Sequence, residues 1–593
     1  MKKGQSQKKL RAKTKGDKLG LALSGGGFRA AFFHLGVLAQ MAELGLLRHV
    51  EVISTVSGGS IVGALYYVHV KKLLEDKPDA EISDDDFRSI VARLEVDFPA
   101  AVRKNIRMRT FQNFFKNLRM RRADYSRSDR IGELYDEHFY RPVLDPKRQS
   151  MIEMRELKIF PKDDKPDFYP LDDNGRRSAK VPILLINATT LNTGHHWRFE
   201  ASRMGEPPLS SPAAIEIDKN LRLRRPPAYD EVTPKQQNFE LGLAVAASAC
   251  VPGLFHPLAV SDLYPDDIRV QLVDGGVHDN QGLQGLLDMS CTRFIVSDAS
   301  GQMDDEPDPA TKIAGVVSRT NSILMDRVRE EQLIRKLGEN ESRIALMHLR
   351  KGLSATAVSW IGADGAVAQE PKPERQPRIA AEDFGVAQEI QLRLSKIRTD
   401  LDSFTEVEAY SLMADGYLMS REELRRASDI ATLIVKKKQK AKEPWRFLRI
   451  APCLSNPTDE FRKQLDVGSE LAFKIFRLSP AVTIVTIAVV AGLGIGAFIL
   501  WMDNIVEFFK FSFTVWEVAL ALAVLALGFI PKLSRIFKIL RFVRAPAEYV
   551  GRLMLRALPS ALGSLFVWIH FFIYDRLFLR RGKLDRLQPP VIP

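Results

Sequence analysis

Cysteine is scarce in this chain. Only three of the 593 residues are cysteine, Cys250, Cys291 and Cys453, and none of them forms a Cys-x-x-Cys pair. The three are widely spaced and odd in number, so neither a disulfide framework nor a zinc site of the Cys-x-x-Cys type is supported. We therefore expect no metal site, no cofactor, and a reducing, cytosolic environment for the soluble part of the chain.

A secretory signal is also missing. Residues 1–17 are rich in lysine, but the apolar run behind them, Leu19–Leu23, is shorter than the roughly 7–15 apolar residues of a signal sequence. We predict no cleaved signal, and we interpret residues 1–17 as a disordered basic tail.

The glycine cluster near the start lacks the Gly-Lys-Ser/Thr ending of a phosphate-binding loop, so nucleotide binding is not expected. The net charge of +13 favours an acidic partner, for which anionic lipid headgroups and nucleic acid are the two candidates. Charge alone does not choose between them. The apolar C-terminal part favours a membrane, and we expect no nucleic acid as a partner.

Residues 18–67 predict a strand, a glycine loop, a helix, a second strand, a tight turn and a second helix. The second strand, Val50–Val56, leads directly to Ser57, which stands before a helix. A serine at such a turn is held above the edge of the sheet, as in a nucleophile elbow. Ser54 and Ser60 are rival nucleophiles, but both lie off the turn.

The residues around this turn suit acyl transfer. Gly25, Gly26 and Gly27 leave backbone N–H groups uncovered near the positive end of the following helix, where an oxyanion would be stabilised. A serine hydroxyl also needs a base, and Asp274 follows a predicted strand at residues 270–273. Further strands are expected at residues 181–187 and 292–297.

On these motifs the chain resembles a patatin-like phospholipase. Its signatures occur in the family's order: a Gly-Gly-Gly-x-Arg loop at residues 25–29, an elbow at residues 55–59 and an Asp-Gly-Gly motif at residues 274–276. The resemblance covers roughly residues 18–300. It implies an α/β fold, namely a three-layer α/β/α sheet domain, with a helical insertion at about residues 78–180.

The resemblance also implies a serine-aspartate dyad that hydrolyses phospholipid, lysophospholipid or another acyl lipid. Asp274 would take the proton of Ser57, whose oxygen attacks an ester carbonyl. The implied oxyanion hole consists of the N–H groups of Gly25, Gly26, Gly27 and Gly58. The resemblance further implies that the loops of the site, or the substrate, are supported by Arg29, Gly275 and Gly276.

One position departs from the family pattern. The usual Gly-x-Ser-x-Gly elbow begins with glycine, where this chain has the β-branched Thr55. We expect the glycines after the serine to relieve the crowding.

The insertion contains a basic and aromatic segment, in which Phe111, Phe114 and Phe115 stand among lysines and arginines. Such a face is typical of a lipid-surface contact or lid. A solvated cap that packs its phenylalanines on the catalytic domain explains the pattern equally well. Residues 301–475 are expected to be mainly helical.

Residues 476–593 form the predicted membrane domain. Residues 481–501 and 511–530 are each about 20 residues long and nearly uncharged, enough to cross a hydrocarbon core of about 30 Å. We predict a transmembrane hairpin, with residues 558–574 interfacial or re-entrant. Lysine and arginine precede the first span and follow the second, which predicts an integral membrane protein with a cytoplasmic catalytic domain.

Two alternatives remain open. An α/β-hydrolase with a Ser-Asp-His triad would take its histidine from His278 or His348, the plausible positions after Asp274. A catalytically silent membrane scaffold or sensor would keep the fold without turnover.

Overall fold

The computed structural model describes residues 17–120, 125–208, 216, 222–226, 228–300, 305–339, 341–353, 358–367, 380–435, 443–510, 561 and 563–587. The chain packs as two compact units. One consists of Met1–Thr110, Met120–Leu471 and Leu579–Pro593, and the other of Phe111–Arg119 and Ala472–Phe578. The predicted tail, apart from Asp17, and the predicted second span at residues 511–530 lie outside the described residues.

A mixed sheet forms the centre of the first unit, with strand order β5-β4-β3-β2-β1-β8-β9. Strands β3, β2, β1, β8 and β9 run parallel, whereas β4, β5, β6 and β7 pair antiparallel, β7 with β3 and β6. Their bounds are β1 Leu19–Leu23, β2 Val50–Val56, β3 Ile183–Thr190, β4 His196–Phe199, β5 Met204–Gly205, β6 Leu258–Val260, β7 Val270–Asp274, β8 Arg293–Asp298 and β9 Ile344–His348. The first two predicted strands are confirmed without a shift, and the other three with small shifts at their ends.

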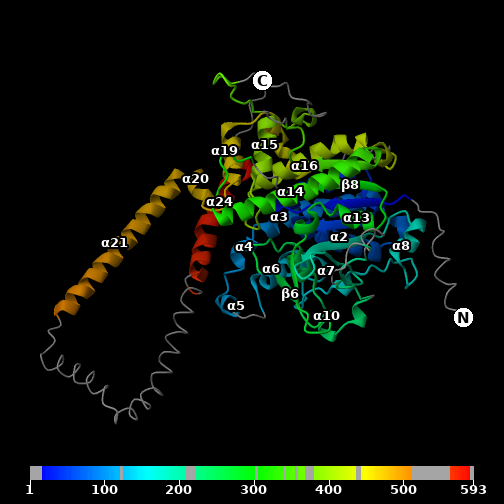
Figure 1. Ribbon diagram of the computed structural model, residues 1–593, viewed down its shortest axis with the longest axis horizontal. Helices are drawn as coiled ribbons and strands as arrows, with labels where there is room; N and C mark the ends of the chain where they lie inside the picture. Colours follow the sequence, from blue (N-terminus) through cyan, green and yellow to red (C-terminus); the bar gives the residue numbers. More distant parts are fainter. Residues whose placement is uncertain are drawn as a thin grey trace, which may run out of the picture. The chain divides into compact units, whose positions relative to one another are not determined.

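Alternate residues of the parallel strands pack into different cores, because successive side chains of a strand point to opposite faces. Leu21 and Ile53 belong to the larger core, which helices α1, α2 and α16 cover. Ala22 and Val52 belong to a smaller core on the other face, together with Leu286 of α13. The sheet therefore has helices on both faces, which confirms the predicted three-layer α/β/α domain (Figure 1).

The helices of the first unit follow the predicted alternation with strands. Helix α1 begins at Gly27, four residues after β1, and α2 begins at Gly58, two residues after β2. The longer ones are α1 Gly27–Glu43, α2 Gly58–Asp76, α3 Asp84–Val102, α6 Arg127–Tyr135, α11 Leu241–Ser248, α13 Leu283–Asp288, α14 Ile313–Glu339, α15 Gln388–Lys396, α16 Glu406–Arg426 and α19 Asp459–Gly468. Shorter ones are α4 Ile106–Arg109, α7 Arg141–Leu144, α8 Pro170–Asp173, α10 Pro234–Gln237, α12 Gly276–Asp279, α17 Ser428–Ala431, α18 Ala451–Ser455 and α24 Arg576–Arg581, with a π-helix at Asp136–Tyr140.

The sheet continues beyond residue 300, where the sequence analysis places the end of the catalytic domain. Strand β9 pairs in parallel with β8, and α16 packs along α1. A residue pattern reports the local structure of a segment but not the partner on which it packs. Residues 301–475, predicted as mainly helical, therefore contribute both a strand and a covering helix to the first unit.

The second unit contains the apolar helix α21, Pro480–Lys510, together with α5 Phe114–Arg119, α20 Lys474–Leu478 and a π-helix at His570–Asp575. Within α21, Pro480–Leu500 is long and apolar enough to cross a membrane, and no part of it is buried in the protein. It is the one such helix among the described residues, so the predicted hairpin is not confirmed. Helix α21 is drawn in orange in Figure 1.

The contact between α1 and α16 offers a test of whether residues 301–475 stabilise the first unit. A Cβ atom on Gly36 would overlap the backbone carbonyl of Met413. We expect Gly36→Ala to lower the free energy of unfolding by about 1–3 kcal/mol, because overpacking displaces backbone. Thermal unfolding followed by circular dichroism measures the change. Gly175→Ala is the matched control, since nothing lies within 4 Å of its new Cβ; equal melting temperatures for both variants would contradict the expectation.

Candidate active site

Ser57 lies at the sharp turn between β2 and α2. Its φ of 50° and ψ of −117° form a conformation that a non-glycine residue rarely adopts and that costs on the order of 1–3 kcal/mol. Its side chain is 7% exposed. The parallel pairing of β1 with β2 brings this turn beside the glycine loop that follows β1. The predicted elbow at Ser57 therefore has the expected geometry.

A chain of hydroxyl groups holds the elbow in place. The Ser57 N–H donates to Ser248 Oγ at 2.9 Å, and the hydroxyls of Ser248 and Ser60 lie 2.8 Å apart. Ser60 donates to Thr55 Oγ1 at 2.9 Å, and Thr55 donates to the Leu185 carbonyl at 3.0 Å. Ser248 stands at the end of α11, so a distant helix fixes the strained turn. No local pattern in the sequence marks Ser248 as a partner of the elbow.

Thr55 itself is accommodated by a glycine one turn into α2. A Cβ atom on Gly63 would lie 2.6 Å from Thr55 Cγ2. Among the glycines after Ser57, Gly63 is therefore the one whose missing side chain makes room for Thr55. Gly58 allows the elbow to pack against the glycine loop, because a Cβ there would overlap the Gly27 carbonyl oxygen.

The glycine loop lies directly against the elbow. A Cβ on Gly25 would come within 3.3 Å of Ser57 Cβ. The Gly25 N–H already donates to the Asn280 carbonyl at 2.9 Å, so it is not available to an oxyanion. Gly26, Gly27 and Gly58 have no hydrogen-bond acceptor for their N–H groups within the described parts of the chain. These three amides are the available donors beside Ser57.

The glycine loop is held from behind by backbone carbonyls on both sides of the predicted domain boundary at residue 300. Arg29 is 3% exposed and donates to the carbonyls of Ala299 at 3.1 Å and Ile397 at 2.7 Å. The Phe28 N–H donates to the Asp400 carbonyl at 3.0 Å. Arg29 therefore supports the loop through main-chain contacts. A surface salt bridge, the competing interpretation of such an arginine, does not fit its burial.

Asp274 ends β7, opposite Ala188 of β3. It is 6% exposed, and its carboxylate accepts a hydrogen bond from the Gly276 N–H at 2.7 Å. Burial raises the pKa of Asp274 from 3.8 to about 6, although the Gly276 N–H and a hydrogen bond from the Ser57 side chain oppose the rise. The structure thus brings Ser57 and Asp274 together, although they are far apart in the sequence.

The two glycines after Asp274 differ in role. A Cβ on Gly275 would overlap the Asn187 carbonyl of β3, so this position needs a bare backbone. Gly276 orients the Asp274 carboxylate through its N–H. Asn280 directly follows the short helix α12. Its side-chain oxygen lies in the space that a Cβ on Gly25 or on Gly276 would occupy, so it fills the gap between the two glycine motifs.

The two histidines of the alternative triad lie in other environments. His348 Nε2 is 3.7 Å from Asp298, and its Nδ1 accepts the Arg350 N–H at 3.1 Å. His278 stacks on His196 with ring centroids 4.8 Å apart. Burial lowers the pKa of His278 to about 4. Neither histidine has a hydrogen bond to Ser57 or Asp274 in the described part of the structure.

His34 was not singled out from the sequence. It lies fully buried on α1, where its Nδ1 is 2.6 Å from Ser297 Oγ and its Nε2 is 3.0 Å from the Ser24 carbonyl. Burial lowers its pKa to about 4, so the ring is neutral at pH 7. It ties the residue before the glycine loop to the end of β8.

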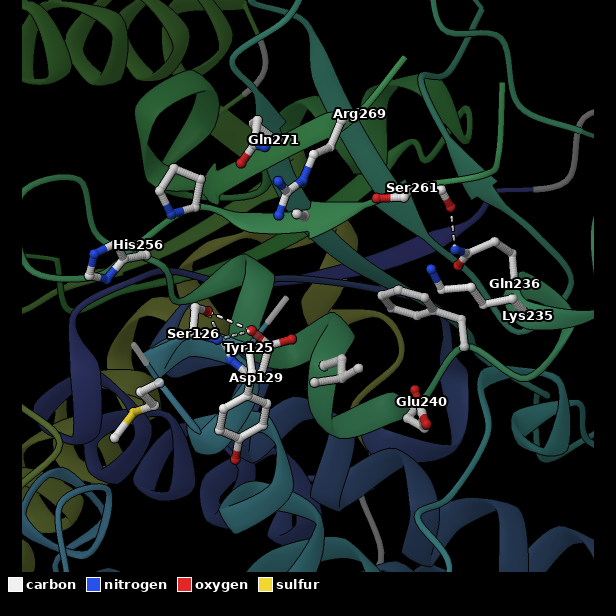
Figure 2. A pocket seen from close by; sticks show the side chains of 15 residues that line it. Tyr125, Ser126, Asp129, Lys235, Gln236, Glu240, His256, Ser261, Arg269 and Gln271 are labelled. Carbon is white, nitrogen blue, oxygen red and sulfur yellow. Dashed lines mark hydrogen bonds between the residues drawn. The ribbon is translucent and has the colours of Figure 1, made fainter. Parts of the chain in front are cut away.

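A cavity of about 930 Å³ opens between the β6–β7 ribbon and helices α6 and α11. Figure 2 shows Arg269 and Gln271 on one wall, with Asp129 and Glu240 on the opposite side. Apolar side chains such as Phe239 also line it. Ser57 and Asp274 are not among its lining residues. However, β7 runs three residues from Gln271 to Asp274, which is about 10 Å.

Comparison with known proteins gives a family match for one part of the chain. The family model described as patatin-like phospholipase matches residues 21–287. No curated protein matches the chain.

Solved structures with some similarity include human GIVD cytosolic phospholipase A2 in complex with methyl gamma-linolenyl fluorophosphonate, at 13% identity and a TM-score of 0.32. That match covers 70% of this chain and 58% of the human chain. VipD from Legionella pneumophila matches at 14% identity and a TM-score of 0.23, over 78% of this chain and 90% of VipD. TM-scores this low do not establish a shared fold.

The contact between Thr55 and Gly63 is open to a double-mutant cycle. We expect Gly63→Ala to lower the free energy of unfolding by about 1–3 kcal/mol, because the new methyl group meets Thr55 Cγ2. Thr55→Ser removes that methyl group and keeps the hydroxyl, so Gly63→Ala in this background should cost less than about 1 kcal/mol. Denaturant unfolding of the four proteins measures both steps. An equal cost in the two backgrounds would show that Gly63 does not compensate for Thr55.

Proposed function

We propose that this chain, whose residues 21–287 belong to the patatin-like phospholipase family, is a membrane-anchored serine hydrolase of lipid acyl esters. The observation that carries the proposal is the position of the Ser57 side chain against the buried Asp274 carboxylate, whose pKa it lowers. It lies beside the free amides of Gly26, Gly27 and Gly58.

The proposed reaction uses these groups in two half-reactions. Asp274 accepts the Ser57 proton while Ser57 Oγ attacks the ester carbonyl, and the glycine N–H groups stabilise the oxyanion. The intermediate then expels the alcohol, which receives the proton from Asp274, and an acyl-serine remains. Asp274 next deprotonates a water molecule that attacks the acyl-serine. Fatty acid leaves, and the proton returns to Ser57.

The environment of Asp274 makes it a better base than an exposed aspartate. Its pKa of about 6 means that the carboxylate is about 90% ionised at pH 7, while its affinity for a proton is about a hundredfold above that of an ordinary aspartate. Burial is the cause, since a charged carboxylate is destabilised away from water. A dry, lipid-filled site would strengthen the effect.

The large cavity supports a lipid substrate. Its walls, α11 and β7, are the elements that end at Ser248 and Asp274 beside the nucleophile. A substrate whose ester group reaches Ser57 would extend into a space of about 930 Å³ with both apolar and charged lining. Phospholipid and lysophospholipid have this combination of apolar chain and polar headgroup.

Two features of the second unit support a membrane anchor. Pro480–Leu500 is 21 residues long, about 31 Å as a helix, and is exposed along its length. The basic and aromatic α5 belongs to the same unit, where Asn117 Nδ2 donates to Ser564 Oγ at 3.0 Å. The basic residues that precede Pro480–Leu500 in the sequence favour a cytoplasmic catalytic domain.

Substitution of the proposed dyad is the direct test. We expect Ser57→Ala and Asp274→Asn each to lower lipid hydrolysis by at least about 10³-fold, because each removes a reacting group. His278→Ala and His348→Ala are the matched controls and should keep most of the activity. Mass spectrometry of lipids after incubation with phosphatidylcholine and lysophosphatidylcholine vesicles measures all four.

The same variants separate the alternatives. Loss of activity in a folded His278→Ala or His348→Ala protein would favour a triad instead. A silent scaffold would release no fatty acid, and a fluorophosphonate probe would not label its Ser57.

The pH profile tests the role of Asp274 independently. Only the ionised carboxylate accepts the serine proton, so kcat/KM should be constant above pH 7 and fall tenfold per pH unit below an apparent pKa of about 6. Hydrolysis of a soluble, uncharged short-chain ester measures it without titrating the substrate. A flat profile from pH 7 to pH 5 in the folded protein would rule out this base.

A further inference from the structure

A second cavity, of about 510 Å³, lies in the first unit away from Ser57. Its walls come from α2, α3, the π-helix Asp136–Tyr140 and α7. Leu65, Phe139, Pro142 and Val143 form an apolar part of the lining. The cavity has the size of a small-molecule site, for which about 300–1,000 Å³ is usual.

The charged lining of this cavity is mostly cationic. Lys72 comes from α2, Arg93 from α3, and Lys104 from the turn after α3. None of these three side chains has an ion-pair or hydrogen-bond partner among the residues that the structure describes. Asp97 is the one acidic residue that the described lining contains. Three cations, all of them exposed to solvent, thus line one hollow together with a single carboxylate.

Two histidines complete the lining. His69 is 6% exposed, and its buried Nε2 has no hydrogen-bond partner in the described structure. The Nε2 of His138 is also buried without a hydrogen-bond partner there, and the nearest carboxylate, that of Glu137, is 3.9 Å away. A buried polar nitrogen without a partner costs free energy. Its presence at the wall of a cationic hollow points to a hydrogen-bond partner outside the described residues.

We propose that this cavity binds a small phosphorylated anion, such as a phosphorylated sugar alcohol or the headgroup of a phosphorylated lipid. The phosphate oxygens would accept hydrogen bonds from Lys72, Arg93 and Lys104, and the organic part would lie against the apolar wall. Cationic side chains bind phosphate through charge-assisted hydrogen bonds. The volume exceeds the needs of a single inorganic phosphate, which favours a ligand with an organic part.

The histidines respond to the same uncompensated charge. The pKa of His69 is lowered to about 4 by burial and by the nearby cations Arg93 and Lys72. The pKa of His138 is also lowered to about 4, by burial and by Arg109, Lys104 and Arg130, against the opposing effect of Glu137. An anion in the cavity would favour the protonated rings. Binding should therefore be coupled to proton uptake by the two rings.

The cavity is connected to the active site through one helix. His69 lies 12 residues after Ser57 in the chain, on α2, or about 18 Å along the helix axis. Tyr140, at the end of the π-helix, donates from its hydroxyl to the Ile61 carbonyl of the same helix at 3.3 Å. An anion that bridges α2, α3 and the π-helix would therefore fix the elements that carry the nucleophile.

Titration calorimetry on the full chain in detergent micelles measures anion binding without turnover. A negative binding result would therefore leave the proposed hydrolase function unaffected. The probe is inositol 1,4,5-trisphosphate. We expect Arg93→Gln with Lys104→Gln to weaken binding at least tenfold. The control, Lys396→Gln with Lys463→Gln, removes the same charge from exposed lysines elsewhere and should leave the affinity unchanged. Equal loss in both double variants, or no binding to the unmodified chain, would overturn the proposal.

Two further measurements define the ligand and guard against misfolding. Lys72→Gln changes one exposed side chain and should weaken binding severalfold even if the double variant does not fold. Phosphatidylcholine vesicles with phosphatidylinositol 4,5-bisphosphate should bind more tightly than vesicles of equal charge made with phosphatidylserine if the source is a lipid. Tight binding of the free trisphosphate alone identifies a soluble ligand. The phosphate groups of the probe also titrate in this range, so the change in affinity between pH 7.5 and pH 5.5 is compared with that of His69→Gln. An equal change in the two proteins would contradict the role of His69.

Discussion

The structure depends on the parallel pairing of β1 with β2. This pairing places two strand-to-helix turns side by side, so the glycine loop after Leu23 lies against the elbow at Ser57. The turns are too close to hold a side chain between Gly27 and Gly58. The same closeness leaves backbone N–H groups beside the serine. One packing constraint thus explains both the glycines and the proposed oxyanion site.

The polar groups that hold this arrangement come from distant parts of the chain. Ser248 on α11 fixes the Ser57 amide, and Arg29 is bonded to carbonyls at Ala299 and Ile397. Buried polar atoms must find hydrogen bonds, so each such contact also fixes the relative position of two segments. Residues after 300 are therefore part of the framework of the site, although the family match ends at residue 287.

Burial gives the ionisable groups of this unit their properties. It raises the pKa of Asp274 toward neutrality and lowers the pKa of His34, His69 and His278 to about 4. Because these histidines are uncharged, they add no positive charge that would lower the pKa of Asp274. Burial likewise lowers the pKa of His69 and His138, so both rings are uncharged beside the basic residues that line the second cavity.

The sequence alone determined the motifs that are local. Strands β1 and β2, the elbow at Ser57, and the pairing of Asp274 with glycines follow from short patterns, and the family resemblance ordered them. Tertiary structure decided what depends on distant partners: Ser248, the methyl group of Thr55 against Gly63, the use of the Gly25 amide by Asn280, and the addition of β9 to the sheet. The physical reason is that periodicity and turn residues report the backbone of a segment, whereas hydrogen bonds and close contacts between segments exist only once the chain has folded.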